Sequence, residues 1–104
     1  MVLRKRVAFG PGKAELLEHI RDTGSIAAAG RMMKMSYTRA WGLVDAMNRD
    51  FASPLVSSAK GGAVRGGATL TALGEDVLGR YRRMETASLK ASTADLRALH
   101  KKLR

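Results

Sequence analysis

The sequence contains no cysteine, and this absence excludes several kinds of chemistry. Disulfide bridges, thiolate metal sites and cysteine-based nucleophilic or redox catalysis are all ruled out. Long apolar runs are also lacking, since no stretch approaches the roughly 18 residues that a membrane-spanning helix needs. The basic segment at residues 1–9 is not followed by the apolar stretch of a signal peptide. We therefore expect a cytoplasmic protein with no membrane partner.

Groups suited to catalysis or metal binding are sparse and scattered. His19 and His100 lie far apart in the sequence, and His19 has no second ligand four residues further on. No nucleophile, base and orienting group form a recognisable set. Thioether sulfur in Met32, Met33 and Met35 suits copper(I), but methionines at helical spacing more simply fill gaps in a core. We expect no enzymatic activity, no cofactor and no bound metal.

Acidic residues are few compared with basic ones. The 104 residues include 19 Lys and Arg but only 9 Asp and Glu, which gives a formal net charge of +10. Such a surplus on one small domain repels itself unless it meets a polyanion, of which nucleic acid is the commonest. Aromatic residues make up only 5% of the chain, too few to favour stacking on unpaired RNA bases. Double-stranded DNA is therefore the expected partner.

The spacing of apolar residues predicts a mainly α domain with a small β-hairpin. The expected elements are a strand at residues 4–9, helices at 13–22, 26–33 and 36–51, hairpin strands at 55–58 and 68–70, and helix from residue 71 onward. Ser25 and Ser36 are suited to cap the second and third helices, because a serine hydroxyl accepts a free backbone N–H. This is the element order of a winged helix-turn-helix domain. We assign it to residues 1–85, followed by a helical extension over residues 86–104.

The sequence is compatible with two secondary structures for the C-terminal part. Residues 72–104 can form one long helix, or Ser92 can cap a separate last helix. An apolar stripe runs along the first part, and a second one continues in a shifted register. The first contains Leu73, Val77, Tyr81 and Met84, and the second contains Leu89, Leu96, Leu99 and Leu103. The second stripe exceeds what one small core requires, so we expect it to form a homodimer contact, together with residues 3–9.

Small residues mark the expected crossing of the second and third helices. Ala28, Ala29 and Gly30 permit the close approach that a steep crossing over a short turn demands. On the third helix, the apolar residues expected to point inward are Ala40, Val44, Met47 and Phe51. The opposite face then contains Thr38, Gly42, Asp45 and Arg49.

The N-terminal end of this third helix is the expected DNA-reading element, as in other helix-turn-helix proteins. Arg39 can pair with a guanine edge, and Ser36 and Thr38 can bond a phosphate or a base. Gly42 would let the helix lie close to the groove floor. The predicted DNA-binding residues here are Ser36, Tyr37, Thr38, Arg39, Gly42 and Arg49. We expect Asp45 to pair with Arg49, to accept a hydrogen bond from a cytosine or to lie beyond the groove. Trp41 is expected to pack against the protein rather than to stack on DNA.

The glycine-rich stretch at residues 60–68 is the expected tip of the hairpin. It lacks the Gly-Lys-Ser/Thr ending of a nucleotide-binding P-loop. As a wing, it would bring Lys60 and Arg65 to a phosphate or to the narrow minor groove. The alternative expectation is a disordered hairpin tip.

Residues 10–85 closely resemble the N-terminal DNA-binding domain of the molybdate-responsive ModE regulators. The shared features are Gly24-Ser25-Ile26-Ala27-Ala28-Ala29, Met35-Ser36-Tyr37, Ala40-Trp41, Asp45, Asn48, Leu70-Thr71 and Leu73-Gly74-Glu75. A more distant likeness to LysR-type regulators covers the helix-turn-helix alone. The resemblance implies a winged helix that dimerises through its terminal helices and binds palindromic promoter DNA. Thr38 stands where the family often has lysine, and no part of the chain up to Arg104 resembles a molybdate pocket.

These observations favour a homodimeric, sequence-specific DNA-binding transcription regulator of ModE type without the molybdate-binding domain, associated with the nucleoid. Two alternatives remain. One is an interaction module that works with a separate effector-sensing protein. The other is a nucleoid-associated protein that binds DNA through charge, independently of sequence.

Overall fold

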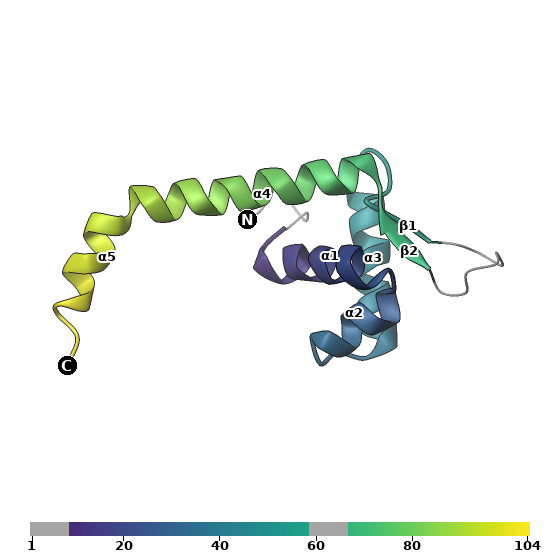
Figure 1. Cartoon of the computed structure of the whole chain (residues 1–104), viewed down its shortest axis with the longest axis horizontal. Coiled ribbons are helices and arrows are strands. Elements are labelled where there is room, and N and C mark those ends of the chain that lie inside the picture. Colours follow the sequence, from purple (N-terminus) through teal and green to yellow (C-terminus); the bar gives the residue numbers. More distant parts are fainter. Residues whose placement is uncertain (1–8, 59–66) are drawn as a thin grey trace.

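The computed structural model describes residues 9–58 and 67–104. Its elements are α1 (Pro11–Thr23), α2 (Ile26–Met32), α3 (Tyr37–Asp50), β1 (Val56–Ser58), β2 (Ala68–Leu70), α4 (Ala72–Ala91) and α5 (Thr93–His100). The first three helices form a body, the hairpin projects from one end of it, and α4 crosses the body and continues beyond it (Figure 1). The predicted order of three helices, hairpin and C-terminal helix is confirmed. The strand expected at residues 4–9 lies outside the described residues except for Phe9, which is not in a strand.

Local sequence explains where the first helices begin and end. Pro11 occupies the first turn of α1, where its missing N–H removes no helical bond. Gly24 ends α1 in the left-handed region, at φ 70°. The predicted caps are confirmed: the Oγ of Ser25 accepts the N–H of Ala28 at 3.1 Å, and that of Ser36 accepts the N–H of Arg39 at 3.1 Å.

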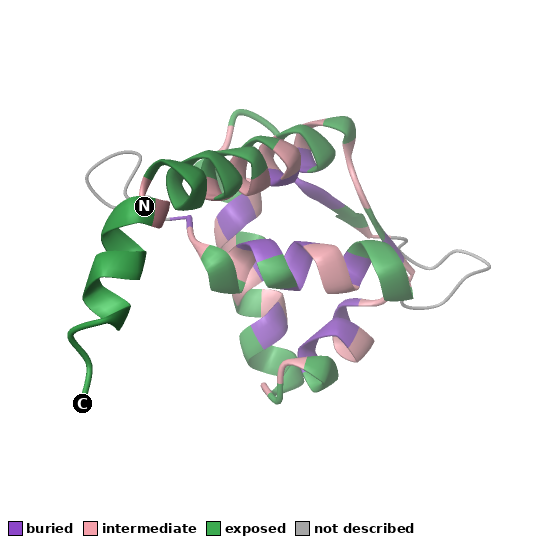
Figure 2. Ribbon diagram, turned by 60° about the vertical axis from the view of Figure 1, so that its left-hand side comes forward, coloured by how far each residue is buried: buried purple, intermediate pink, exposed green. Residues whose placement is uncertain are grey.

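The core lies where the three helices meet beneath α4. Leu16, Leu17 and Ile20 of α1 are fully buried. Three of the four residues predicted to point inward from α3, namely Ala40, Val44 and Met47, are buried as well, and Phe51 packs against them half-buried. Figure 2 shows these buried positions on the inner sides of the body helices.

The hairpin is attached to the body at several points. Its strands pair antiparallel, with Val56 opposite Leu70 and Ser58 opposite Ala68. The N–H of Ala68 donates to the carbonyl of Gly24 at 2.9 Å, which ties β2 to the turn between α1 and α2. The described part of the hairpin is thereby held in a defined direction relative to the helix-turn-helix.

The C-terminal part forms two helices, which answers the question that the sequence left open. The chain turns at Ser92, but the hydroxyl of Ser92 donates to the carbonyl of Ser88 and makes no cap for α5. Leu78 of α4 is buried, although the apolar stripe predicted from the sequence did not include it. Met84, which that stripe did include, is 53% exposed. None of the helices in the described ranges is long and apolar enough to cross a membrane.

Candidate nucleic-acid interface

One face of α3 is exposed in the part of the chain that the structure describes. Thr38, Gly42, Asp45 and Arg49 are exposed, as predicted, because a helix that buries Ala40, Val44 and Met47 turns these positions away from the core. A Cβ atom added to Gly42 would meet no atom within 4 Å. The face from Thr38 to Arg49 is therefore open along about three turns of the helix.

The two flanks of this face differ. On one flank, Arg39 lies at the edge of a shallow groove whose apolar lining includes Phe9, Met33 and Leu43. On the other flank, the rings of Tyr37 and Trp41 meet edge to face, with their centroids 6.1 Å apart. Tyr37 is 59% exposed.

Trp41 packs against the core, as expected from the sequence. Its Nε1 atom is buried without a hydrogen-bond acceptor among the residues that the structure describes. A buried donor left unpaired costs free energy, so the packing of the ring against the core holds it in place, not a bond at Nε1.

Charge is unevenly distributed along the face. The first turn of α3 contains no acidic residue. Near this end, Arg31, Lys34 and Arg39 are all exposed. At the other end, Arg49 lies 3.8 Å from Asp45, and both side chains are about 70% exposed. Such a surface pair is weak, so the pairing expected from the sequence is present but leaves Arg49 able to turn to a phosphate. The N-terminal end of α3 is therefore surrounded by exposed positive charge with no acidic residue in the first turn.

The predicted site residues do not all come together. Ser36, Tyr37, Thr38 and Arg39 share the first turn, and Gly42 follows one turn later. Arg49 lies eleven residues beyond Thr38, about 16 Å further along the helix axis at 1.5 Å per residue. The other two predicted residues, Lys60 and Arg65, lie outside the described residues. The structure thus places one compact group at the helix N-terminus and Arg49 apart from it.

Asn48 has a structural role that the sequence analysis did not predict. Its Oδ1 atom accepts the N–H groups of Leu55 at 2.9 Å and Val56 at 3.1 Å, and its Nδ2 atom donates to the carbonyl of Val56 at 3.1 Å. This half-buried side chain joins α3 to β1 and so orients the hairpin beside the reading helix. Its place among the residues shared with the ModE regulators was the one sequence signal for it.

Lys34 was also missed. It occupies the turn between α2 and α3 with φ 57°, the one non-glycine residue at positive φ in the described ranges. Its side chain is exposed near the start of α3. A basic residue at this position adds to the positive potential at the helix N-terminus.

No family model matches the chain. Curated relatives do, over most of its length. MopB of Rhodobacter capsulatus, named a molybdenum-pterin-binding protein, is 41% identical over 87 residues, which are 84% of this chain and 32% of that protein. The transcriptional regulator ModE of Yersinia pestis is 36% identical over 86% of this chain and 34% of its own length. The DNA-binding transcriptional dual regulator ModE of Escherichia coli K12 is 34% identical over 76% of this chain and 30% of its own. The predicted resemblance to the ModE regulators is confirmed, and the chain spans about a third of the length of these relatives.

Solved structures confirm the fold. The DNA-binding domain of CbnR, crystallised in complex with DNA, superimposes with a TM-score of 0.66 over 85% of this chain and 95% of that domain, at 19% identity. Full-length LysG of Corynebacterium glutamicum, a LysR-type regulator, gives a TM-score of 0.65 over 92% of this chain and 31% of its own, at 22% identity. The winged helix-turn-helix architecture and the expected likeness to LysR-type domains are therefore both established.

Proposed function

We propose that the chain is the DNA-binding part of a transcription regulator and that α3 enters the major groove of double-stranded DNA. The observation that carries this proposal is the exposed first turn of α3, which has three cations around it and no acidic residue. The ModE regulators named above support it, since they are similar to this chain over three quarters or more of its length.

Each residue of the first turn has a distinct part in this proposal. The Oγ of Ser36 accepts the N–H of Arg39 in the helix cap. Its O–H group can therefore donate to a phosphate oxygen. Thr38 and Arg39 face bases, and the guanidinium of Arg39 can donate two hydrogen bonds to a guanine. The exposed ring of Tyr37 covers a sugar or a thymine methyl group, and Gly42 permits close approach to the groove floor. Arg49, Lys60 and Arg65 would contact the backbone.

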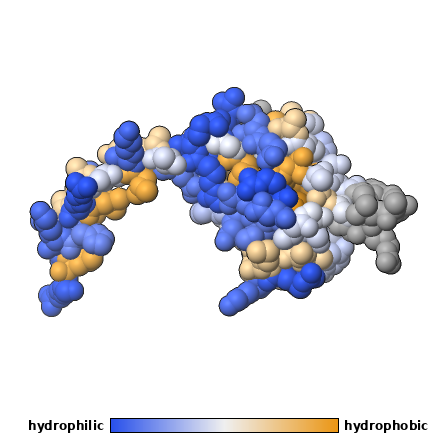
Figure 3. All heavy atoms as spheres, in the orientation of Figure 1, coloured by the Kyte–Doolittle hydropathy of each residue, from blue (hydrophilic) through white to orange (hydrophobic). Residues whose placement is uncertain are grey.

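A second copy of the chain is the proposed partner of the arm, which we define as residues 83–104. The arm extends beyond the body (Figure 1), and apolar residues follow it on the molecular surface (Figure 3). Its exposed apolar side chains are Met84, Leu89, Leu96, Leu99 and Leu103. Short helices without packing are marginally stable in water, so an arm with so much exposed leucine needs a partner. A homodimer would bring two α3 helices to two half-sites one helical turn apart.

A genomic-fragment selection with the purified protein at physiological salt tests the function, run with and without molybdate. We expect an enriched palindrome for the wild type. Arg39→Ala should abolish base preference at one position of each half-site, a loss of about 1–3 kcal/mol. Arg80→Ala is the matched control, because it removes the same charge from an exposed position of α4. Equal effects of the two variants would contradict the assignment of α3.

The other candidate functions give different results in the same selection. Binding without an enriched sequence, and with a steep salt dependence, would identify a charge-driven nucleoid protein. No binding at all would favour a module that works with a separate sensor protein, for which the exposed leucines of the arm would be the docking face. An effect of molybdate would link this chain directly to an oxyanion signal.

A further inference from the structure

A bridge of three side chains connects α4 to α1. Arg82 of α4 donates from Nε to Oε2 of Glu18 at 3.1 Å and from Nη2 to Oε1 of Glu18 at 2.5 Å. Its Nη1 atom donates to Glu85 at 2.6 Å. All three side chains are about one-third exposed. Arg82 thus makes a bidentate contact with Glu18 of α1. Glu85, which lies on α4 like Arg82, accepts a further bond from the same guanidinium.

This bridge is unlike the other ion pairs of the described residues. Each of the others joins residues of one helix, at most four positions apart, whereas Glu18 and Arg82 are 64 residues apart. A bidentate arginine–carboxylate pair restricts both distance and angle, which apolar packing does not. Because the pair is partly exposed, its contribution to the free energy of unfolding is modest. Its main physical consequence is orientation.

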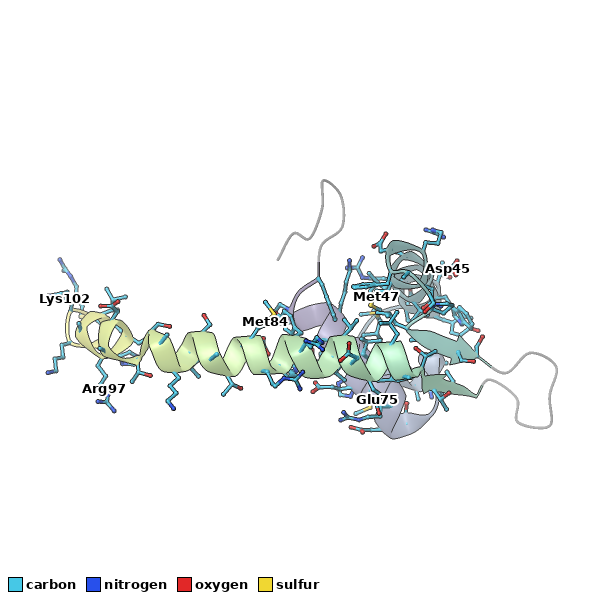
Figure 4. All side chains as sticks on the ribbon, turned by 90° about the horizontal axis from the view of Figure 1, so that it is seen from above. Asp45, Met47, Glu75, Met84, Arg97 and Lys102 are labelled. Atoms are coloured by element: carbon cyan, nitrogen blue, oxygen red, sulfur yellow. The ribbon has the colours of Figure 1, made fainter. Side chains whose placement is uncertain are left out.

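Among the residues that the structure describes, the bridge lies where the packing of α4 on the body ends. Before it, Leu78 is buried, and Tyr81 stacks on Phe9 with a ring distance of 5.2 Å. After it, residues 83–91 are exposed apart from half-buried Glu85. Figure 4 shows α4 as a straight rod, with Arg97 and Lys102 at the end of the arm opposite to Asp45 on α3. The arm therefore leaves the body at Arg82, with the reading helix on one side of this point and the exposed leucines on the other.

We propose that Arg82 is a positioning residue that sets the angle between the arm and the helix-turn-helix body, and thereby the spacing of half-sites that a dimer selects. This inference rests on the dimeric DNA binding proposed above. The nine residues that follow Arg82, up to Ala91, form a lever of about 14 Å at 1.5 Å per residue. A rotation of about 15° at its base moves the far end by about 3.6 Å, close to the roughly 3.4 Å rise of one base pair. A small change of angle at the bridge thus changes the spacing that two bodies can span.

The test is a selection among duplexes that contain two copies of the wild-type half-site separated by spacers of varied length. For Arg82→Met and Glu18→Gln, the preference for the best spacer over its neighbours should fall about fivefold, equivalent to about 1 kcal/mol. The double variant should show no further loss, because both changes break one interaction. Affinity for a single half-site should stay at the wild-type value in all three.

Two controls and a second variant keep the test specific. Glu85→Gln removes only the partner within α4, and Arg80→Met removes an arginine whose pair with Asp76 lies within the same helix. Arg80→Met should keep the wild-type spacer preference. Glu85→Gln should lose less of it than Glu18→Gln, because both bonds between Arg82 and Glu18 stay in place. Arg82→Lys retains the charge without the two-pronged geometry, so it should fold normally and still lose preference, even if Arg82→Met folds poorly.

The outcomes separate the inference from the proposed function. A wild-type protein that selects no paired half-sites would overturn the dimer and this inference with it. A wild-type preference that Arg82→Lys and Glu18→Gln leave unchanged would overturn the positioning role alone. Equal losses of single-site affinity and spacer preference would show a merely structural role, which also overturns it.

Discussion

Gly30 of α2 lies directly against Ala40 of α3 where the two helices of the helix-turn-helix pack together. A Cβ atom added to Gly30 would lie 2.9 Å from the Cβ atom of Ala40, too close for ordinary carbon contact. Both residues are buried, and the carbonyl of Gly30 accepts the N–H of Met35 in the turn at 3.0 Å. The crossing of α2 and α3 therefore depends on the missing side chain of Gly30.

Replacement of Gly30 by alanine should destabilise the protein. Overpacking costs about 1–3 kcal/mol, which exceeds the gain of about 1 kcal/mol in helix propensity. We expect a net loss of about 1 kcal/mol in the free energy of unfolding, measured by chemical denaturation. Gly42→Ala is the control, because the same change meets no atom within 4 Å in the interior of α3. It should raise stability by up to about 1 kcal/mol, and it should weaken DNA binding if α3 lies on the groove floor. Equal stability changes in both variants would disprove the close-contact explanation.

Removal of the Asn48 side chain should loosen the hairpin. Asn48→Ala leaves the N–H groups of Leu55 and Val56 without their acceptor, at about 1–3 kcal/mol for each buried donor left unpaired. Asn48→Asp retains the acceptor but loses the bond to the Val56 carbonyl, so its loss should be smaller. Hydrogen exchange at the two amides measures the effect. Protection that is unchanged in Asn48→Ala would contradict the role given to this side chain.

The contrast between Ser36 and Asn48 shows how far the sequence alone leads. Ser36 caps a helix through a bond to a residue three positions away, so its role follows from local sequence. The bonds of Asn48 reach seven and eight residues along the chain, past the end of α3, and helical spacing gives no sign of them. The same limit applies more strongly to Glu18 and Arg82, which only the packing of α4 on α1 brings together. The caps of α2 and α3, most of the inward stripe of α3 and the two hairpin strands could therefore be predicted, but the orientation of hairpin and arm could not.

The pH dependence of stability should reveal the bridge between Glu18 and Arg82. The hydrogen bonds from Arg82 hold the pKa of Glu18 below its ordinary value, against the opposing effect of partial burial. Because the folded-state pKa is lowered, the stabilisation is fully present above about pH 4.3, the ordinary glutamate value. It is lost as the pH falls through the lowered pKa.

A titration of the Glu18 carboxyl by nuclear magnetic resonance measures this pKa directly. In the Arg82→Met variant, the pKa of Glu18 should rise towards the ordinary glutamate value, and the corresponding pH dependence of the unfolding free energy should shrink. Glu85→Gln provides the comparison, since it leaves the contact between Glu18 and Arg82 in place. The prediction is wrong if Glu18 titrates identically in the wild type and in Arg82→Met.

Polar substitutions on the arm should separate folding from dimer formation. Leu89 and Leu99 are 62% and 60% exposed and do not belong to the core. The double variant Leu89→Gln/Leu99→Gln should therefore keep the wild-type fold of the body. Light scattering should find it as a monomer at concentrations where the wild type is a dimer. Ala94→Gln, at an exposed position on the opposite side of α5, is the matched control and should remain dimeric.

The same leucine variant should bind paired half-sites about 100-fold more weakly than the wild type, because the second half-site contributes through effective concentration only when two bodies are joined. Binding to one half-site should not change, since the arm is distant from α3. If the variant stays dimeric, the leucines of the arm are not the dimer contact, and residues elsewhere must hold the two copies together. If the wild type itself is monomeric at high concentration, the leucines must have another partner, which is the result expected of a module that docks on a separate sensor protein.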